Sequence, residues 1–253
     1  WVPPLDAPLV DAFPDYPDLA QDPARRRILV RHALTMTLGL EWDESLPCSD
    51  PRNSEIAMER APDRLRYALD RPVLRPPGEA WTYSGGATAL IGAALARGVG
   101  MEIDAYAKAR LFDPLGIETW EWMRGDDGTP SAASGLRMSA RGLAKLARML
   151  LAQGRAADGR QLIPAEWIAE SFRPRVPTGP AEFDPGYGYF WWTAPGESPP
   201  WAAGFGNGGQ RLSINRGLDL AMIVLAGNYD RPDAWRLPVH ISQAVLGPAL
   251  EGR

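Results

Sequence analysis

The 253-residue sequence contains a single cysteine, Cys48. One cysteine cannot form an intramolecular disulfide, and it cannot supply the several thiolates of a zinc or iron–sulfur cluster. These two kinds of stabilising centre are therefore excluded within the chain. A lone thiol of this kind is typically a small buried hydrophobic side chain, so Cys48 does not indicate a redox compartment.

Long apolar runs are also absent. No segment approaches the roughly 18 uninterrupted apolar residues of a membrane-spanning helix, so no membrane span is expected. The residues from Trp1 to Asp6 lack the charged start and the apolar stretch of a signal peptide. Such a peptide, if the protein has one, would have to precede Trp1.

Neither sign of charge dominates. The chain has 27 basic and 31 acidic side chains, a net charge of −4, and its short basic run Arg25–Arg27 is too small for a phosphate-binding patch. Nucleic acid is therefore not expected as a partner. Only two of the basic residues are lysines, Lys108 and Lys145.

The residues and motifs of the common catalytic sites are scarce. His32 and His240 both fall in segments with helical patterning, where a single histidine is more often packed or exposed than catalytic. The pair Asp126-Asp127, followed by Gly128, is typical of a solvated turn. There is no Gly-x-Ser-x-Gly elbow, His-Glu-x-x-His pair, phosphate-binding loop or dinucleotide fingerprint.

The patterning that is present predicts an α+β protein. Apolar residues at helical spacing predict helices over residues 28–40, 60–69 and 85–98, with two more starting after Ser139 and at Pro164. Six prolines in residues 1–24 predict an extended arm that runs over the surface. Aromatic and β-branched runs predict antiparallel strands over residues 187–192, 210–215 and 218–226, covered by a last helix over 237–246.

These elements favour one unit over residues 1–253, because a chain of this size with 45% hydrophobic residues can bury a sizeable core. Within it, residues 1–165 are predicted to be mainly helical. Residues 166–253 are predicted to form mainly an antiparallel sheet with a C-terminal helix.

Four motifs occur in a characteristic order along this pattern. They are Leu34-Thr35-Met36-Thr37-Leu38-Gly39-Leu40, Pro77-Gly78-x-x-Trp81-x-Tyr83-Ser84, Gly135-Leu136-Arg137-Met138-Ser139-Ala140 and Ala203-Gly204-Phe205-Gly206-Asn207-Gly208-Gly209-Gln210. Together they resemble the serine β-lactamase-like hydrolases: class C β-lactamases, penicillin-binding D-Ala-D-Ala peptidases, related esterases and 6-aminohexanoate-dimer hydrolases. The resemblance runs from Leu5 to about Leu250. It implies the β-lactamase/penicillin-binding-protein fold, a helical region plus an antiparallel sheet flanked by helices.

The resemblance also implies roles for individual residues. In the family, a Ser-x-x-Lys turn supplies the acylated serine, its lysine lies beside a tyrosine, and the third motif supplies an oxyanion-hole amide. Tyr83 is then the tyrosine that moves the proton, and the Gln210 amide holds the oxyanion. Ser84 either assists proton transfer or caps the helix that follows it. No metal and no organic cofactor is expected.

One element of the family pattern is missing. No serine of the sequence is followed three residues later by lysine, and both lysines lie on later amphipathic segments. A tyrosine with an ordinary pKa of about 10 needs a nearby cation to act as a base. We therefore expect the serine and lysine upstream of Trp1, in an N-terminal part that is absent from this sequence. That part would belong to a longer chain or be a separate chain.

Two further departures concern the substrate. Gly85 stands where β-lactamases often have asparagine, and Asn207 stands where they have a lysine that attracts a substrate carboxylate. Gly208 and Gly209 let the backbone approach the acyl carbonyl. The neighbouring Trp191 and Trp192 are predicted to form an aromatic wall; strand alternation lets at most one of them face the cleft.

The sequence therefore predicts a serine hydrolase that cleaves a carboxylic ester or amide through an acyl-enzyme. One alternative is a β-lactamase or D-Ala-D-Ala peptidase, whose substrate would be a β-lactam or a peptide. The other is a pseudoenzyme that keeps the groove and binds a ligand. A Ser-x-x-Lys motif before Trp1 would favour the enzyme. The resemblance favours a periplasmic or secreted location over a cytoplasmic one.

Overall fold

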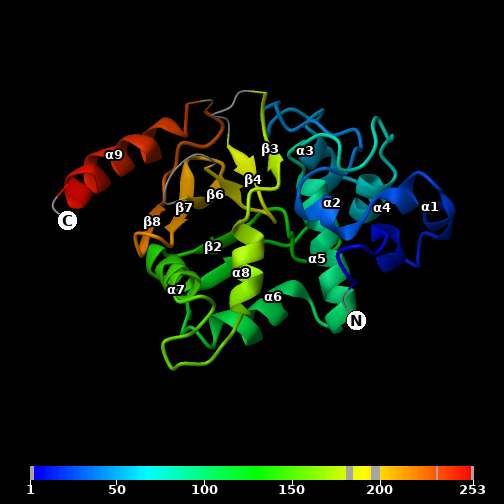
Figure 1. Cartoon of the computed structure of the whole chain (residues 1–253). Helices are drawn as coiled ribbons and strands as arrows, with labels where there is room; N and C mark the ends of the chain where they lie inside the picture. Colours follow the sequence, from blue (N-terminus) through cyan, green and yellow to red (C-terminus); the bar gives the residue numbers. More distant parts are fainter. Residues whose placement is uncertain (1–2, 181–184, 195–199, 232, 252–253) are drawn as a thin grey trace.

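The computed structural model describes residues 3–180, 185–194, 200–231 and 233–251. The chain forms a helical part and a six-stranded antiparallel sheet that lie side by side (Figure 1). The early helices, coloured blue to cyan, gather around the N-terminus. The sheet, coloured yellow to orange, lies between them and the last helix.

The helical part begins with short elements. They are η1 (Leu9–Ala12), α1 (Pro17–Gln21), η2 (Arg25–Arg27), α2 (Val30–Leu34), α3 (Ser54–Glu59), α4 (Arg64–Leu69) and α5 (Gly85–Val99). Polar side chains cap three of these helices, because the first N–H groups of a helix have no partner within it. Asn53 caps α3, Asp63 caps α4 and Ser84 caps α5.

Two predictions for this part are wrong. Residues 1–24 do not run over the surface, because Leu9, Val10 and Phe13 are almost completely buried in the helical core. The helix predicted over 28–40 ends at Leu34, since Met36 adopts a left-handed backbone with φ of 57°. That conformation cannot continue an α-helix.

The middle of the chain contains α6 (Ile103–Ala107), the π-helical turn η3 (Lys108–Phe112), the small hairpin of β1 (Trp120–Trp122) and β2 (Leu136–Met138), α7 (Ala140–Leu151) and α8 (Ala165–Phe172). The predicted N-cap of α7 is confirmed: the Ser139 hydroxyl accepts a hydrogen bond from the Gly142 N–H at 3.1 Å. Pro164 lies at the N-cap of α8 rather than inside its first turn.

The large sheet has its strands in chain order: β3 (Val176–Pro177), β4 (Gly186–Tyr187), β5 (Trp192–Thr193), β6 (Ala202–Gly206), β7 (Gln210–Asn215) and β8 (Leu220–Val224). Every neighbouring pair is antiparallel, and the pairing of Gly206 with Gln210 closes the β6–β7 hairpin. The predicted strand over 210–215 is confirmed. A strand is also present within residues 218–226, although it is shorter than predicted.

The strand predicted over residues 187–192 is wrong. Tyr187 of β4 pairs with Trp192 of β5, so the aromatic run folds back on itself. Phe190 makes this turn possible with a φ of 59°. The rule that successive strand residues face opposite sides therefore does not apply to Trp191 and Trp192.

Helix α7 packs against β7 and β8, where Ala147, Met149 and Leu150 meet Ile214 in a second core. The last helix, α9 (Arg236–Glu251), lies towards the outer end of the molecule (Figure 1). Among the described residues, no helix is both long and apolar enough to cross a membrane.

Candidate active site

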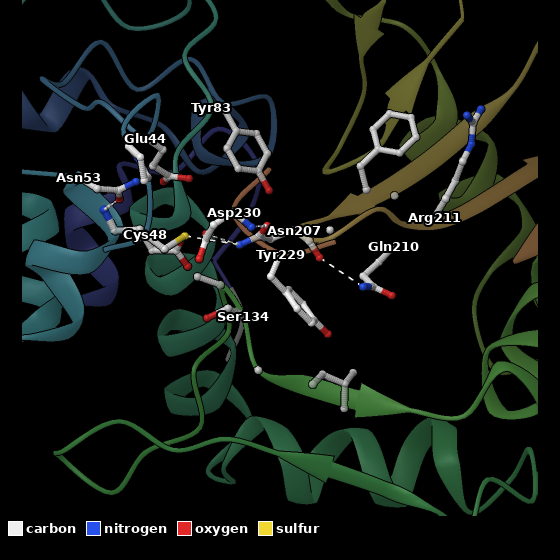
Figure 2. A pocket seen from close by; sticks show the side chains of 18 of the residues that line it. Glu44, Cys48, Asn53, Tyr83, Ser134, Asn207, Gln210, Arg211, Tyr229 and Asp230 are labelled. Atoms are coloured by element: carbon white, nitrogen blue, oxygen red, sulfur yellow. Dashed lines mark hydrogen bonds between the residues drawn. The ribbon is translucent and has the colours of Figure 1, made fainter. Parts of the chain in front are cut away.

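A cleft of about 1950 Å³ opens between the helical part and the sheet. Glu44 and Tyr83 line its helical side, and Asn207 and Gln210 line its sheet side (Figure 2). The residue Leu136, from β2, contributes to the same lining. Motifs that are far apart in the sequence therefore meet in one cavity.

Tyr83 reaches this cleft from the N-terminal end of α5. Its hydroxyl points into the cleft (Figure 2), its side chain is partly exposed, and its ring stacks on Trp192 at 6.2 Å between centroids. Ser84 is buried, and its hydroxyl accepts a hydrogen bond from the Ala87 N–H at 3.1 Å. The structure therefore shows Ser84 as a helix cap, and Ser84 does not line the cleft.

The surroundings of Tyr83 oppose its ionisation. Burial, followed by the negative charges of Glu44 and Glu55, raises the pKa of Tyr83 to about 12. The two lysines do not offset this effect, because Lys108 pairs with Asp113 and Lys145 donates to the Gly116 carbonyl, both away from the cleft. Tyr83 would need a cation from elsewhere to act as a base.

The β6–β7 turn depends on its two glycines. Gly208 and Gly209 have φ angles of 84° and 89°, which side-chain-bearing residues adopt rarely. A Cβ atom on Gly209 would lie 2.7 Å from the Ala234 carbonyl oxygen. Neither glycine lines the cleft itself, but together they fix the positions of Asn207 and Gln210, which do.

The polar side chains of this turn bind one another and their neighbours. The Asn207 amide donates to the Asp230 carboxylate at 3.2 Å and to the Cys48 sulfur at 3.5 Å, and its oxygen accepts from the Asp230 N–H at 3.2 Å (Figure 2). The Gln210 side chain accepts from the Ala226 N–H at 3.2 Å and donates to the Ala226 carbonyl. A carboxylate therefore lies beside the Asn207 side chain.

Position 85 differs from its predicted role in binding substrate. The Gly85 N–H donates to Glu44 Oε1 at 2.5 Å, and the glycine does not line the cleft. A Cβ atom at this position would lie 3.2 Å from both Glu44 Oε1 and Glu55 Cγ. Two carboxylates thus fill the space of the missing side chain.

The two tryptophans predicted to form an aromatic wall are not among the residues that line the cleft. Trp191 packs edge-on against Phe172 at 4.8 Å, and it does not line the cleft. Trp192 lies behind the lining, in contact with the rings of Tyr83 and Phe205, which do face the cavity. The tryptophans therefore support the wall rather than form its surface.

Glu44, Glu55 and Asp230 line the cleft but were not predicted from the sequence. No motif marks them, because each comes from a different loop or helix start and only tertiary packing brings them together. Among the described residues, no group of three or more histidine, cysteine, aspartate or glutamate side chains is arranged to hold a metal ion.

Comparison with known proteins places this architecture in a family. The family described as Beta-lactamase matches residues 4–239. The chain therefore belongs to the beta-lactamase family, and it has the β-lactamase/penicillin-binding-protein-like fold. A comparison with curated protein sequences found no significant match.

Among solved structures, the fold is similar to that of a Bacillus anthracis protein assigned as a 6-aminohexanoate-dimer hydrolase, with a TM-score of 0.82 and 15% identity over 98% of this chain and 67% of the other. The octameric penicillin-binding protein homologue from Pyrococcus abyssi has a TM-score of 0.72 and 19% identity, over 97% of this chain and 60% of the other. EstCE1, described as a hydrolase with promiscuous acyltransferase activity, has a TM-score of 0.72 and 17% identity, over 96% of this chain and 78% of the other. At these identities the similarity shows the fold alone, and the chain spans only 60% of the length of the Pyrococcus protein.

Proposed function

We propose that this chain provides the proton-transferring tyrosine and the substrate cleft of a serine hydrolase that cleaves a carboxylic ester or amide through an acyl-enzyme. The observation that carries the proposal is that Tyr83 and Gln210 line one cavity. These are the two positions that the family resemblance links to proton transfer and to oxyanion stabilisation.

The proposed reaction begins when a serine hydroxyl attacks the substrate carbonyl while the Tyr83 phenolate takes its proton. The oxyanion that forms would accept a hydrogen bond from the Gln210 backbone N–H. Collapse of the intermediate expels an alcohol or amine, which takes the proton back from Tyr83. Water then attacks the acyl-enzyme, with Tyr83 again holding the transferred proton, and releases a carboxylic acid and free serine.

The serine and the required cation are not provided by a Ser-x-x-Lys motif within these 253 residues. We place both in a segment outside this sequence, on the same polypeptide or on a separate one. The raised pKa of Tyr83 supports this arrangement, since a phenol surrounded by carboxylates becomes a base only when a positive charge lies close to it.

Three arginines, Arg137, Arg211 and Arg231, line the cleft, but the turn at Asn207 favours a substrate without a carboxylate at that point. Asp230, which bonds Asn207, would repel the carboxylate of a β-lactam or a peptide C-terminus there. Phe205, Leu225 and Leu136 line the same cleft with exposed apolar surface. These side chains suit an uncharged ester or amide with an apolar acyl or alcohol group.

The test is turnover by the protein produced from its whole gene. We expect hydrolysis of p-nitrophenyl butyrate to exceed that of benzylpenicillin, in kcat/KM, by more than about tenfold. Comparable rates would instead support the β-lactamase alternative, and cleavage of a D-Ala-D-Ala peptide would support the peptidase.

A pseudoenzyme remains the second candidate function, and the acidic surroundings of Tyr83 are the observation that favours it. In that case the cleft binds a small molecule and no acyl group is transferred. A gene that encodes no Ser-x-x-Lys before Trp1, together with no ester hydrolysis, would establish this candidate over the enzyme.

A further inference from the structure

Position 85 shows how this chain compensates for a missing motif residue. The glycine follows Tyr83 and Ser84 at the start of α5, and a Cβ atom here would lie 3.2 Å from side-chain atoms of two glutamates, a tight contact. Glu44 comes from the loop after Trp42, and Glu55 comes from the first turn of α3. Their carboxylates therefore converge on one spot beside Tyr83.

Contacts within the chain place both glutamates at this spot. Glu44 Oε1 accepts from the Gly85 N–H and from the Trp42 indole N–H, each at 2.5 Å. Glu55 lies in the first turn of α3, and its Cγ and Cδ atoms would lie 3.2 and 3.3 Å from a Cβ atom at position 85.

Among the described residues, no lysine or arginine forms an ion pair with Glu44 or Glu55. The buried guanidinium near α3, Arg64, pairs with Glu59 at 2.9 Å and with Asp127 at 2.8 Å instead. Helix α3 thus presents one glutamate that is paired, Glu59, and one that is not, Glu55.

We propose that Glu44 and Glu55 are positioning residues for Tyr83: they occupy the place of the side chain absent at position 85, and their negative charge keeps the Tyr83 phenol protonated until a cation lies beside them. This inference rests on the proposed function and extends it. It assigns the control of the proton-transferring tyrosine to two residues outside all four sequence motifs.

The electrostatics agree with this geometry. Burial raises the pKa of Glu44, and burial followed by the charges of Glu44 and Glu59 raises the pKa of Glu55 to about 7. The other titratable groups that interact with the pair are Asp43, whose charge raises the pKa of Glu44, and Tyr83, Tyr187 and Cys48, whose own pKa values are raised. As the pH passes 7, Glu55 becomes charged and the Tyr83 phenol holds its proton more strongly.

The inference can be tested on this chain without turnover. The protein is labelled with 3-fluorotyrosine, the Tyr83 resonance is assigned with Tyr83→Phe, and the pKa of Tyr83 is followed by ¹⁹F NMR. Glu55→Gln should weaken the proton affinity of Tyr83 by about threefold to tenfold, and Glu44→Gln should act in the same direction. Glu102→Gln, whose carboxylate pairs with Arg124 at 2.8 Å and does not line the cleft, is the matched control and should leave this titration unchanged.

Circular dichroism identifies variants that fold, and the two glutamine variants provide independent tests. An unchanged Tyr83 titration in folded Glu55→Gln or Glu44→Gln overturns the inference, as does an equal shift in Glu102→Gln. Ester hydrolysis by the whole-gene protein is measured separately. A shifted titration without hydrolysis overturns only the proposed function, whereas hydrolysis with an unshifted titration overturns only this inference.

Discussion

The two sides of the cleft differ in how far this chain completes them. On the sheet side, Asn207 and Gln210 bond the neighbouring Asp230 and Ala226. On the helical side, Glu44 and Glu55 lack a basic partner in the described structure, and the pKa of Tyr83 is raised to about 12. The polar side chains of the sheet side bond their neighbours, while no lysine or arginine of the described residues pairs with the two glutamates of the helical side.

This difference has an energetic meaning. Carboxylates taken partly out of water resist ionisation unless a cation or several hydrogen bonds compensate for the lost solvation. Glu55 has two like-charged neighbours, Glu44 and Glu59, so burial and repulsion both raise its pKa. Two unpaired, partly buried glutamates therefore lower the stability of the fold. Such a cost is typical of a functional site.

The largest expected effect is a loss of activity when Tyr83, on the helical side of the cleft, is replaced. In the whole-gene protein, Tyr83→Phe removes the group that carries the proton and should lower kcat/KM for p-nitrophenyl butyrate by about 10²- to 10⁴-fold. Tyr229→Phe is the matched control, because Tyr229 lines the same cleft from the sheet side. Equal activity in Tyr83→Phe and wild type would remove Tyr83 from the mechanism.

The second prediction concerns Arg64, whose ion pair with Glu59 distinguishes this glutamate from the unpaired Glu55. Arg64→Ala leaves Glu59 and Asp127 without their buried partner and should lower the free energy of unfolding by about 3–5 kcal/mol. Arg52→Ala, which breaks an exposed pair with Asp50, should cost less than about 1 kcal/mol. Urea denaturation measures the free energy of unfolding of both variants. Similar losses would show that the buried Arg64 pairs stabilise the fold no more than an exposed pair does.

The third prediction concerns the turn on the sheet side. Gly209→Ala forces a left-handed backbone onto alanine and brings its Cβ against the Ala234 carbonyl, so it should cost about 1–3 kcal/mol. Gly204→Ala serves as control, since a Cβ atom there meets nothing within 4 Å. Thermal denaturation compares the two, and a smaller loss for Gly209 would contradict the role of the turn.

The smallest expected effect appears in the pH dependence of stability. Because the pKa of Glu55 is raised in the folded state, its favourable contribution is complete below its unfolded pKa, near 4.5, and is lost as the pH rises through about 7. The gain in unfolding free energy that Glu55→Gln causes should therefore be about 1–2 kcal/mol larger at pH 8 than at pH 5. Melting curves at both pH values test this, and a stabilisation that is equal at both would refute the assigned ionisation.

Local sequence rules predicted the elements whose shape depends on local interactions. The Ser139 cap and the strand that begins at Gln210 follow from hydrogen-bonding and β-propensity rules, and both are present. The same rules failed where one residue adopts an unusual backbone. Met36 ends a helix early and Phe190 folds a strand back, and neither residue type indicates a positive φ.

The candidate site could be predicted only in part for a similar reason. Tyr83, Asn207 and Gln210 belong to motifs, and they do line the cleft. Glu44 and Glu55 could not be predicted, because each is an ordinary surface-type residue in its own segment. Their effect on Tyr83 arises only when folding brings the loop after Trp42 and the start of α3 over Gly85.

The central claim, that Tyr83 serves a serine acyl-enzyme, is tested most directly by intact-mass spectrometry of the protein produced from its whole gene, before and after a serine-reactive fluorophosphonate. The proposed function predicts a stoichiometric adduct on a serine outside residues 1–253, formed much more slowly in Tyr83→Phe than in Tyr229→Phe. A protein that acquires no adduct, or one whose labelling does not depend on Tyr83, would contradict it.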